Sequence, residues 1–176
     1  MDHKAFVFDH ARFSHELAGL LASSLESGSV AGLRRFVGDQ LSDLKDPYEG
    51  QPLAADWESL LETRDAHQYG DFALTKYYDP ADDLGLGRDW ERIRSMLTKP
   101  LNGDVRLFLG VPFGPKNNLF DPGKLGSYFQ SPQMARQHLA QLHPLRSIPG
   151  LGEVLPEVLR IFEQAALQDR GLYITF

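Results

Sequence analysis

The chain has 176 residues and a formal net charge of −6, with 42% hydrophobic and 24% charged residues. This balance is typical of a globular protein rather than a disordered one, and the length predicts a single domain over 1–176. The acidic charge argues against nonspecific nucleic-acid binding, and the absence of cysteine excludes disulfides, thiolate nucleophiles and cysteine-based zinc sites.

The N-terminal segment MDHKAFVFDHARF contains no apolar run of signal-peptide length. No stretch of the chain approaches the roughly 20 apolar residues that a membrane span requires. We therefore expect a cytoplasmic protein that does not enter the membrane.

The first predicted element is a strand at 4–8, where KAFVF is short, aromatic and β-branched. Asp9 is suited to cap a helix that Gly28 ends, and a second helix follows Ser29. We expect the two helices to form an N-terminal hairpin. Their apolar stripes, at helical spacing, are Phe13, Leu17, Leu20, Leu21 and Leu25 in the first helix and Val30, Leu33, Val37, Leu41 and Leu44 in the second.

The sequence pattern in the middle of the chain predicts short elements that alternate with loops. Proline and glycine mark 46–55 as a loop, after which a short helix follows Asp56. The alternation of large and small side chains over 71–78 predicts a strand. A helix is expected from Asp89, and the apolar run VRLFLGV predicts a strand at 105–111.

The last third begins with a long irregular loop at 112–128, rich in proline and glycine. Ser131 and Pro132 have the residue types of a helix start, with serine as the cap and proline at the first helical position. A final helix is predicted from about Gly152 to Gln168. LYITF at 172–176 predicts a closing strand.

These elements follow the order β, α, α, α, β, α, β, α, α, β, without steady strand–helix alternation and without a phosphate-loop glycine pattern. The fold class is therefore predicted to be α+β. We expect a small, mainly antiparallel sheet packed with about six helices.

The tripeptide Asp-Trp-Glu occurs twice, and its two copies contain both tryptophans of the chain. We interpret Asp56 and Asp89 as helix caps whose carboxylates accept backbone N–H bonds, with each tryptophan anchoring the start of its helix. The alternative brings the two acidic pairs together as acid and base. Sequence spacing gives that alternative no support.

No metal site or cofactor is predicted. The six histidines contain no HExxH pair, which would put two ligands on one helix face. The acidic turn with Asp79, Asp82 and Asp83 lacks the ligand spacing of a calcium loop, so it predicts a solvated turn.

The segment 112–129 carries aromatic residues on a predicted loop. Aromatic side chains on surface loops are typical of recognition surfaces. In the other interpretation, these side chains fold back and cap the sheet. The predicted partner-binding surface combines the acidic turn and this loop: Asp79, Asp82, Asp83, Phe113, Phe120 and Tyr128.

Three segments of the second half resemble the YfbM-like family of small uncharacterised bacterial proteins: GLGRDWERIRSMLT, LGSYFQSPQMARQHLAQL and FEQAALQDRGLYITF. In that family an Asp-Trp segment opens a helix ending in Leu-Thr, and an aromatic residue precedes a Ser/Thr-Pro helix start. A late helix with an alanine pair then runs into a final strand. The resemblance covers about 86–176 and implies a small α+β domain. It implies no catalytic residue.

We predict a non-enzymatic binding protein of the cytoplasm. Its most concrete form is an immunity protein that neutralises a bacterial toxin by direct protein–protein binding. A small acidic domain without an assembled catalytic motif favours this function. The alternatives are a small hydrolase that uses Asp, Glu and His from separate elements, and a regulatory interaction module.

Overall fold

Three strands form one antiparallel sheet in the order β1-β3-β2. In the computed structural model, which describes residues 1–104 and 106–176, the C-terminal strand is the central one and pairs with both others. The strands are β1 (Lys4–Phe8), β2 (Ser127–Gln130) and β3 (Gly171–Thr175).

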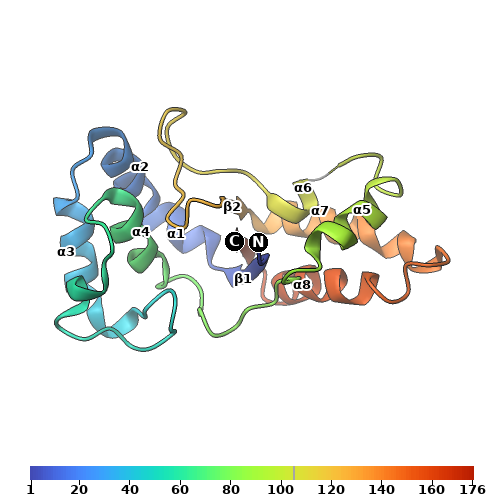
Figure 1. Cartoon of the computed structure of the whole chain (residues 1–176), viewed down its shortest axis with the longest axis horizontal. Helices are drawn as coiled ribbons and strands as arrows, with labels where there is room; N and C mark the ends of the chain where they lie inside the picture. Colours follow the sequence, from blue (N-terminus) through green and yellow to red (C-terminus); the bar gives the residue numbers. More distant parts are fainter. Residues whose placement is uncertain (105) are drawn as a thin grey trace.

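Helices of the first half of the chain pack on one side of this sheet. Figure 1 shows α2, α3 and α4 at one end of the long axis, with the strands and both termini near the middle. The helices are α1 (His10–Glu16), α2 (Ala18–Ser27), α3 (Ala31–Asp39) and α4 (Ala66–Leu74), with the 3-10 turns η1 (Leu41–Asp43) and η2 (Trp57–Leu60) between them.

Helices of the second half pack on the other side and extend toward the opposite end of the molecule (Figure 1). Of these, α7 and α8 lie side by side and contact β3. The elements are α5 (Trp90–Thr98), α6 (Arg106–Leu109), α7 (Pro132–Leu142), the 3-10 turn η3 (His143–Ser147) and α8 (Leu155–Leu167).

The sheet separates two hydrophobic cores because successive side chains of a strand point to opposite faces. On β3, Leu172 and Ile174 pack into the core of the second-half helices, which also holds Trp90. Tyr173 lies between them in the chain and faces the core of the first-half helices, which holds Trp57. Each tryptophan is buried in a different core, and each is only 5% exposed.

The α+β class and the antiparallel sheet are confirmed, with eight α-helices in the described residues where about six were expected. The strands predicted at 4–8 and 172–176 are present. The predicted hairpin forms between α2 and α3, but the first predicted helix is divided at Leu17 into α1 and α2, and the second ends at Asp39, before Leu41 and Leu44. The start of α7 is also confirmed, since the Ser131 hydroxyl accepts a bond from the N–H of Met134 at 3.2 Å.

The strand predicted at 71–78 is wrong, because residues through Leu74 belong to α4. This helix is buried on every side: Ala66 and every residue from Gln68 to Leu74 lie in the interior. A helix that is buried all round has no polar face and shows no stripe of 3.6-residue period. The chance alternation of large and small side chains therefore suggested a strand.

The strand predicted at 105–111 is also wrong over Arg106–Leu109, which form the helix α6, while Val105 lies outside the described residues. The carboxylate of Asp104 accepts a bond from the N–H of Arg106 at 3.1 Å, as a cap does at a helix start. An apolar run this short does not distinguish a helix from a strand. Val111 does pair with Phe129, as an isolated bridge.

The segment predicted as a loop at 112–128 ends in the strand β2, which the sequence did not reveal. Its four residues are too few to show a period of two. Gly126 precedes it with φ of 112°, and a Cβ there would approach the ring of Tyr128 to 2.7 Å. The glycine therefore marks the sharp entry into a strand rather than the interior of a loop.

Candidate functional site

The outer edge of β1 is partly covered by the chain that follows α4. In an antiparallel strand, alternate residues turn their N–H and C=O groups toward opposite neighbours. The N–H of Ala5 donates to the carboxylate of Asp83 at 3.1 Å, and its C=O accepts from the N–H of Leu84 at 2.8 Å. Ala5 thus has its backbone groups on the open side of the sheet, where this later segment pairs with it.

The same segment returns to the strand at Asp9, whose N–H donates to the C=O of Tyr77 at 2.8 Å. Between these two attachments, residues 77–84 bow away from the strand; we call them the arch. Val7 has the same orientation as Ala5 and lies under the arch. Within the described chain, neither its N–H nor its C=O makes a hydrogen bond. One peptide edge of β1 is therefore open.

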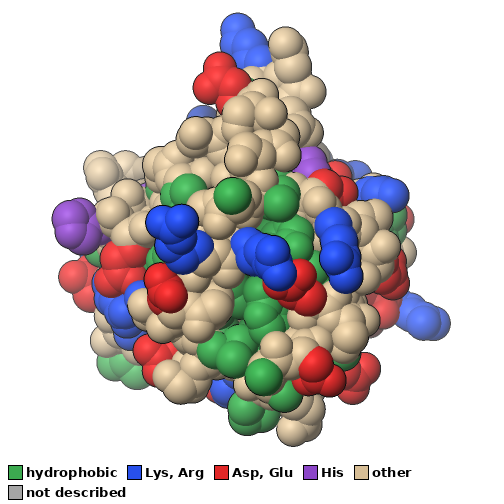
Figure 2. All heavy atoms as spheres, turned by 90° about the vertical axis from the view of Figure 1, so that its left-hand side faces the viewer, with side chains coloured by type: hydrophobic (Ala, Val, Ile, Leu, Met, Phe, Trp, Pro, Cys, Tyr) green, Lys and Arg blue, Asp and Glu red, His purple; other side chains and the backbone are tan. Residues whose placement is uncertain are grey.

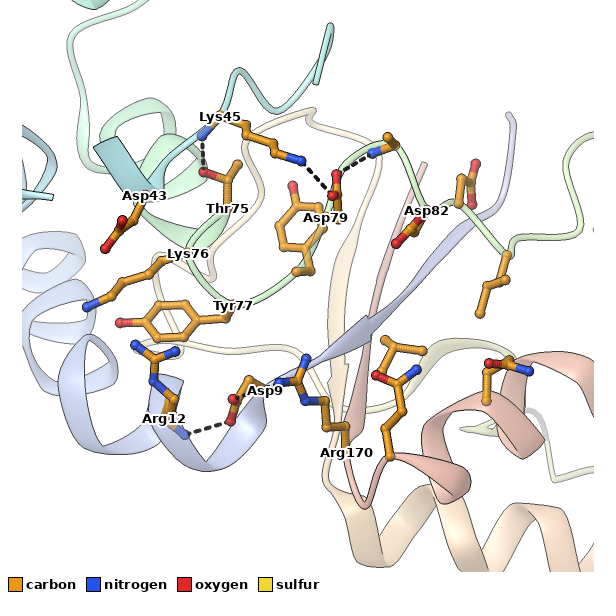
Figure 3. A pocket seen from close by; sticks show the side chains of 17 residues that line it. Asp9, Arg12, Asp43, Lys45, Thr75, Lys76, Tyr77, Asp79, Asp82 and Arg170 are labelled. Atoms are coloured by element: carbon orange, nitrogen blue, oxygen red, sulfur yellow. Dashed lines mark hydrogen bonds and ion pairs between the residues drawn. The ribbon is translucent and has the colours of Figure 1, made fainter. Parts of the chain in front are cut away.

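This open edge lies in a cleft of about 650 Å³, which we call the edge cleft. Figure 3 shows β1 crossing the cleft, the arch on one side, and the end of α8 with Arg170 on the other. The cleft therefore lies where the two helical layers meet at the edge of the sheet. Its polar lining differs from the mostly apolar lining of a typical small-molecule pocket.

Ion pairs neutralise most charges around the edge cleft. The ammonium of Lys45 lies 2.5 Å from the carboxylate of Asp79, and this contact holds the pKa of Asp79 below its ordinary value. Arg170 lies 3.4 Å from Asp9, whose carboxylate also accepts a bond from the N–H of Arg12 (Figure 3). These ion pairs hold the walls of the cleft in place and leave few unpaired charges that could meet a ligand.

A second ion-pair group closes the α1 side. Glu16 accepts hydrogen bonds from Lys76 at 2.8 Å and from Arg12 at 3.1 Å. The bond from Lys76 is the main cause that lowers the pKa of Glu16 to about 2. Burial and the nearby Glu16 carboxylate in turn raise the pKa of the Tyr77 hydroxyl.

The remaining charge in the edge cleft is negative. Asp43 and Asp82 are exposed and make no ion pair within the described chain. Asp83 differs, since its carboxylate accepts bonds from the N–H groups of Ala5 and Gly85. Of the three acidic residues that the sequence singled out, Asp82 is the one free to meet a ligand, while Asp79 and Asp83 hold the arch.

The predicted aromatic half of the binding surface is mostly turned inward, with Phe120 buried and Phe113 and Tyr128 half-buried. Phe120 is only 1% exposed and lies in the core of the first-half helices. Phe113 packs against the same core and Tyr128 against the other one. Their positions agree with the interpretation in which these rings fold back on the sheet.

The two halves of that predicted surface also lie at opposite edges of the sheet. The acidic turn follows the outer edge of β1 through Ala5. The aromatic segment joins the outer edge of β2 through the bridge from Val111 to Phe129. The acidic half lines the edge cleft, and none of the three aromatic residues is part of that lining.

Four histidine rings make hydrogen bonds within the described chain, those of His3, His10, His67 and His138. The His3 ring contacts the Phe108 carbonyl at 3.0 Å, and burial lowers its pKa. The His138 ring lies 2.8 Å from the side-chain oxygen of Gln130, and burial lowers its pKa as well. Among the described residues, no histidine ring contacts a carboxylate, which is the pairing that a histidine-based hydrolase would use.

A second hollow of about 620 Å³ lies on the end face formed by the first-half helices. Figure 2 views this end, where apolar side chains form a central strip between charged ones. Arg34 lies beside this hollow and is paired with Glu58 at 2.5 Å, and Trp57 at its floor is buried. Nothing in the structure indicates what would cover this hollow.

In the residues that the structure describes, no three His, Asp or Glu side chains are arranged to hold a metal ion. None of the described helices combines the length and the apolar character needed to cross a membrane. No family model, curated protein or solved structure matches this chain. The resemblance of 86–176 to the YfbM-like family stays a prediction from the sequence.

Proposed function

We propose that this chain is a non-enzymatic binding protein whose edge cleft takes an extended, basic segment of a partner protein. The observation that carries the proposal is the open peptide edge at Val7, placed in a cleft whose unneutralised side chains, Asp43 and Asp82, are acidic. A peptide that adds to a strand edge gains main-chain hydrogen bonds, and its alternate side chains give specificity.

The charge of the cleft selects the kind of segment. Lysine or arginine side chains on one face of the added peptide would meet Asp82 and Asp43, while an acidic segment would be repelled. Exposed carboxylates raise the association rate by steering a basic partner and contribute less to the final affinity. The overall charge of −6 acts in the same direction.

The most concrete form of this function is an immunity protein of the cytoplasm that neutralises a bacterial toxin by covering it. A regulatory interaction module would use the same cleft. A neighbouring gene encoding a secreted toxin would support the first form over the second. The hydrolase alternative draws no support from the histidines, because their described contacts are structural.

A peptide titration followed by NMR tests the proposal. The probe is acetyl-Arg-Ser-Arg-Ser-Arg-amide, whose period of two puts its basic side chains on one face. We expect the largest amide shifts at Val7 and along the arch, and binding that weakens as salt is added. The control peptide, with glutamate in place of arginine, should not bind.

Two variants separate the main-chain contact from the charge contact. Val7→Pro removes the outward N–H, and proline is tolerated on an edge strand where the N–H faces outward; binding should be lost. Asp82→Asn should weaken binding about two- to fivefold, as expected for one exposed ion pair. Asp39→Asn, the same change on α3 away from the cleft, should have no effect. Equal binding of both peptides, or full binding by a folded Val7→Pro variant, would refute the proposal.

A further inference from the structure

Asp71 is a carboxyl group in the interior of the protein. It lies on α4, is 5% exposed, and forms no ion pair with any described residue. The nearby hydroxyl of Tyr48, which accepts a bond from the Gln68 amide at 3.0 Å, favours the charged form of this carboxyl and lowers its pKa. An interior carboxylate without a counter-ion is costly, and its small exposed part must face some opening.

That opening is a cavity of about 120 Å³, which we call the Asp71 cavity. It lies on the first-half side of the sheet, and Tyr48, which is 56% exposed, stands at its rim. At roughly 30 Å³ for each water, it has room for about four water molecules or an organic group of similar size.

The walls of the Asp71 cavity are aromatic. The ring centroids of Phe6 and Tyr78 lie 4.7 Å apart, and those of Tyr78 and Tyr173 lie 5.2 Å apart. Phe176 and Tyr48 also line it. Aromatic faces attract cations through their electron-rich surfaces, so an alkylammonium group lying against these rings gains a favourable contact.

We propose that the Asp71 cavity binds a small alkylammonium group, which the Asp71 carboxylate neutralises and which lies against the aromatic wall that includes Tyr78 and Tyr173. This ligand supplies an ion-pair partner for Asp71, which Lys4, at the rim, does not form in the described chain. The group is either a free short amine or the end of a lysine side chain from another molecule. The site shares Tyr78 with the lining of the edge cleft, but it depends on Asp71 and not on the open edge of β1, so each proposal has its own test.

The polar side chains that line the Asp71 cavity besides Asp71 are Lys4, Thr175 and three tyrosines. The charged and titratable groups that face Asp71 are Asp46 and Tyr48 from the turn after η1, Lys4 from β1, Tyr78 from the arch and Tyr173 from β3. Lys4 is exposed, and its charge reaches Asp71 from the rim without forming an ion pair.

The affinity of the Asp71 cavity for a cation should depend on pH. Burial raises the pKa of Asp71 to about 7, with the nearby charge of Asp46 acting in the same direction. The carboxyl is therefore mostly neutral at pH 6 and mostly charged at pH 8, so a cation that needs the charged form should bind about tenfold more tightly at pH 8. Bound cation should also lower the pKa of Asp71, since binding and proton release are linked.

The experiment uses n-propylammonium chloride as the probe and n-propanol as its neutral counterpart of equal length. NMR of the Asp71 side-chain carboxyl carbon follows protonation and binding together. We expect the carboxyl signal to move with propylammonium, more strongly at pH 8, and not with propanol. Acetyl-lysine amide is a second probe. If only propylammonium binds, the ligand of the cavity is a free amine. If both probes bind, the ligand includes the end of a lysine side chain.

Two variants complete the test. Asp71→Asn keeps the shape of the neutral carboxyl, so it should fold and lose at least tenfold in propylammonium affinity. Tyr48→Phe removes the hydroxyl that stabilises the carboxylate, so the pH profile should move to higher pH. Equal binding of propanol, unchanged binding by Asp71→Asn, or a carboxyl carbon that reports only its own titration would overturn the proposal. In the last case the Asp71 cavity would hold water alone.

Discussion

A helix cap depends on the backbone of the capping residue as well as on its side chain. Asp65 has extended dihedrals, φ −116° and ψ 174°, and its carboxylate accepts bonds from the N–H groups of His67 and Gln68, both at 3.0 Å. Asp89 has helical dihedrals, φ −80° and ψ −5°, and Asp56 also lies outside the extended region; neither side chain makes a cap bond. The caps predicted at Asp56 and Asp89 are therefore wrong, although both tryptophans beside them are buried as expected.

This contrast predicts different costs for the same substitution. Asp65→Ala should lower the free energy of unfolding by about 1 kcal/mol, because two backbone N–H groups lose their acceptor. Asp89→Ala should change it by less than about 0.5 kcal/mol, since that side chain is exposed and pairs loosely with Arg92 at 3.5 Å. Urea unfolding of the two variants measures both values. Equal losses would show that Asp89 caps α5 in solution.

At the scale of elements, the predictions that succeeded have strong local signals. The stripe of α8 and the Ser131-Pro132 start of α7 depend on residues close together in the chain. The failures, α4 and α6, lack such a signal for different reasons. Burial of α4 on almost every side removes the exposed polar face that would reveal a helical period, and α6 is too short to show a period.

One charged contact joins two elements that are far apart in the chain. Glu16 at the end of α1 bonds to Lys76, which follows α4 and is only 11% exposed. The same carboxylate accepts from the hydroxyl of Tyr77 at 3.3 Å. This contact attaches the first helix to the base of the arch and therefore supports one wall of the edge cleft.

The contact predicts a pH-dependent stability. The pKa of Glu16 falls from its ordinary 4.5 to about 2 in the folded protein, so the unfolded chain binds the proton more readily. The stabilisation is thus complete above pH 4.5 and is lost as the pH falls from 4.5 to 2. Glu16→Gln should be less stable than the parent protein at pH 7, by on the order of 1 kcal/mol. The difference should disappear near pH 2 in urea unfolding.

A matched control is Glu26→Gln on α2, where the carboxylate is exposed and makes no ion pair in the described chain. Its stability difference from the parent protein should be small and should not change between pH 4.5 and 2. If both variants showed the same pH dependence, the effect would come from overall charge rather than from the bond to Lys76.

At the scale of the whole molecule, the edge cleft shows why only part of the site could be predicted. Asp79, Asp82 and Asp83 lie close together in the sequence and were identified together. Val7 becomes an open edge only because β3, from the other end of the chain, occupies the centre of the sheet. Arg170 likewise reaches the cleft only through the position of the last strand. Such long-range pairing leaves no local pattern.

The central position of β3 in the sheet also predicts how the molecule unfolds. Leu172 and Ile174 of β3 belong to one core and Tyr173 to the other, so neither core can lose this strand without disturbing its neighbour. A chain with two cores sharing one strand should therefore unfold in a single cooperative step. Trp57 and Trp90 report on the two cores separately, since each is buried in one of them.

Two single-tryptophan variants test this cooperativity. Trp57→Phe retains the reporter of the second-half core, and Trp90→Phe retains that of the first-half core. Each substitution lowers stability by its own amount, so the comparison is made within each variant, between tryptophan fluorescence and far-ultraviolet circular dichroism. We expect coincident urea midpoints by the two probes in both variants, because the shared strand couples the cores. A fluorescence midpoint that precedes the dichroism midpoint in one variant alone would mean that its core opens first. In that case β3 would stay packed against the other core after the first core has opened, and the edge cleft would be lost.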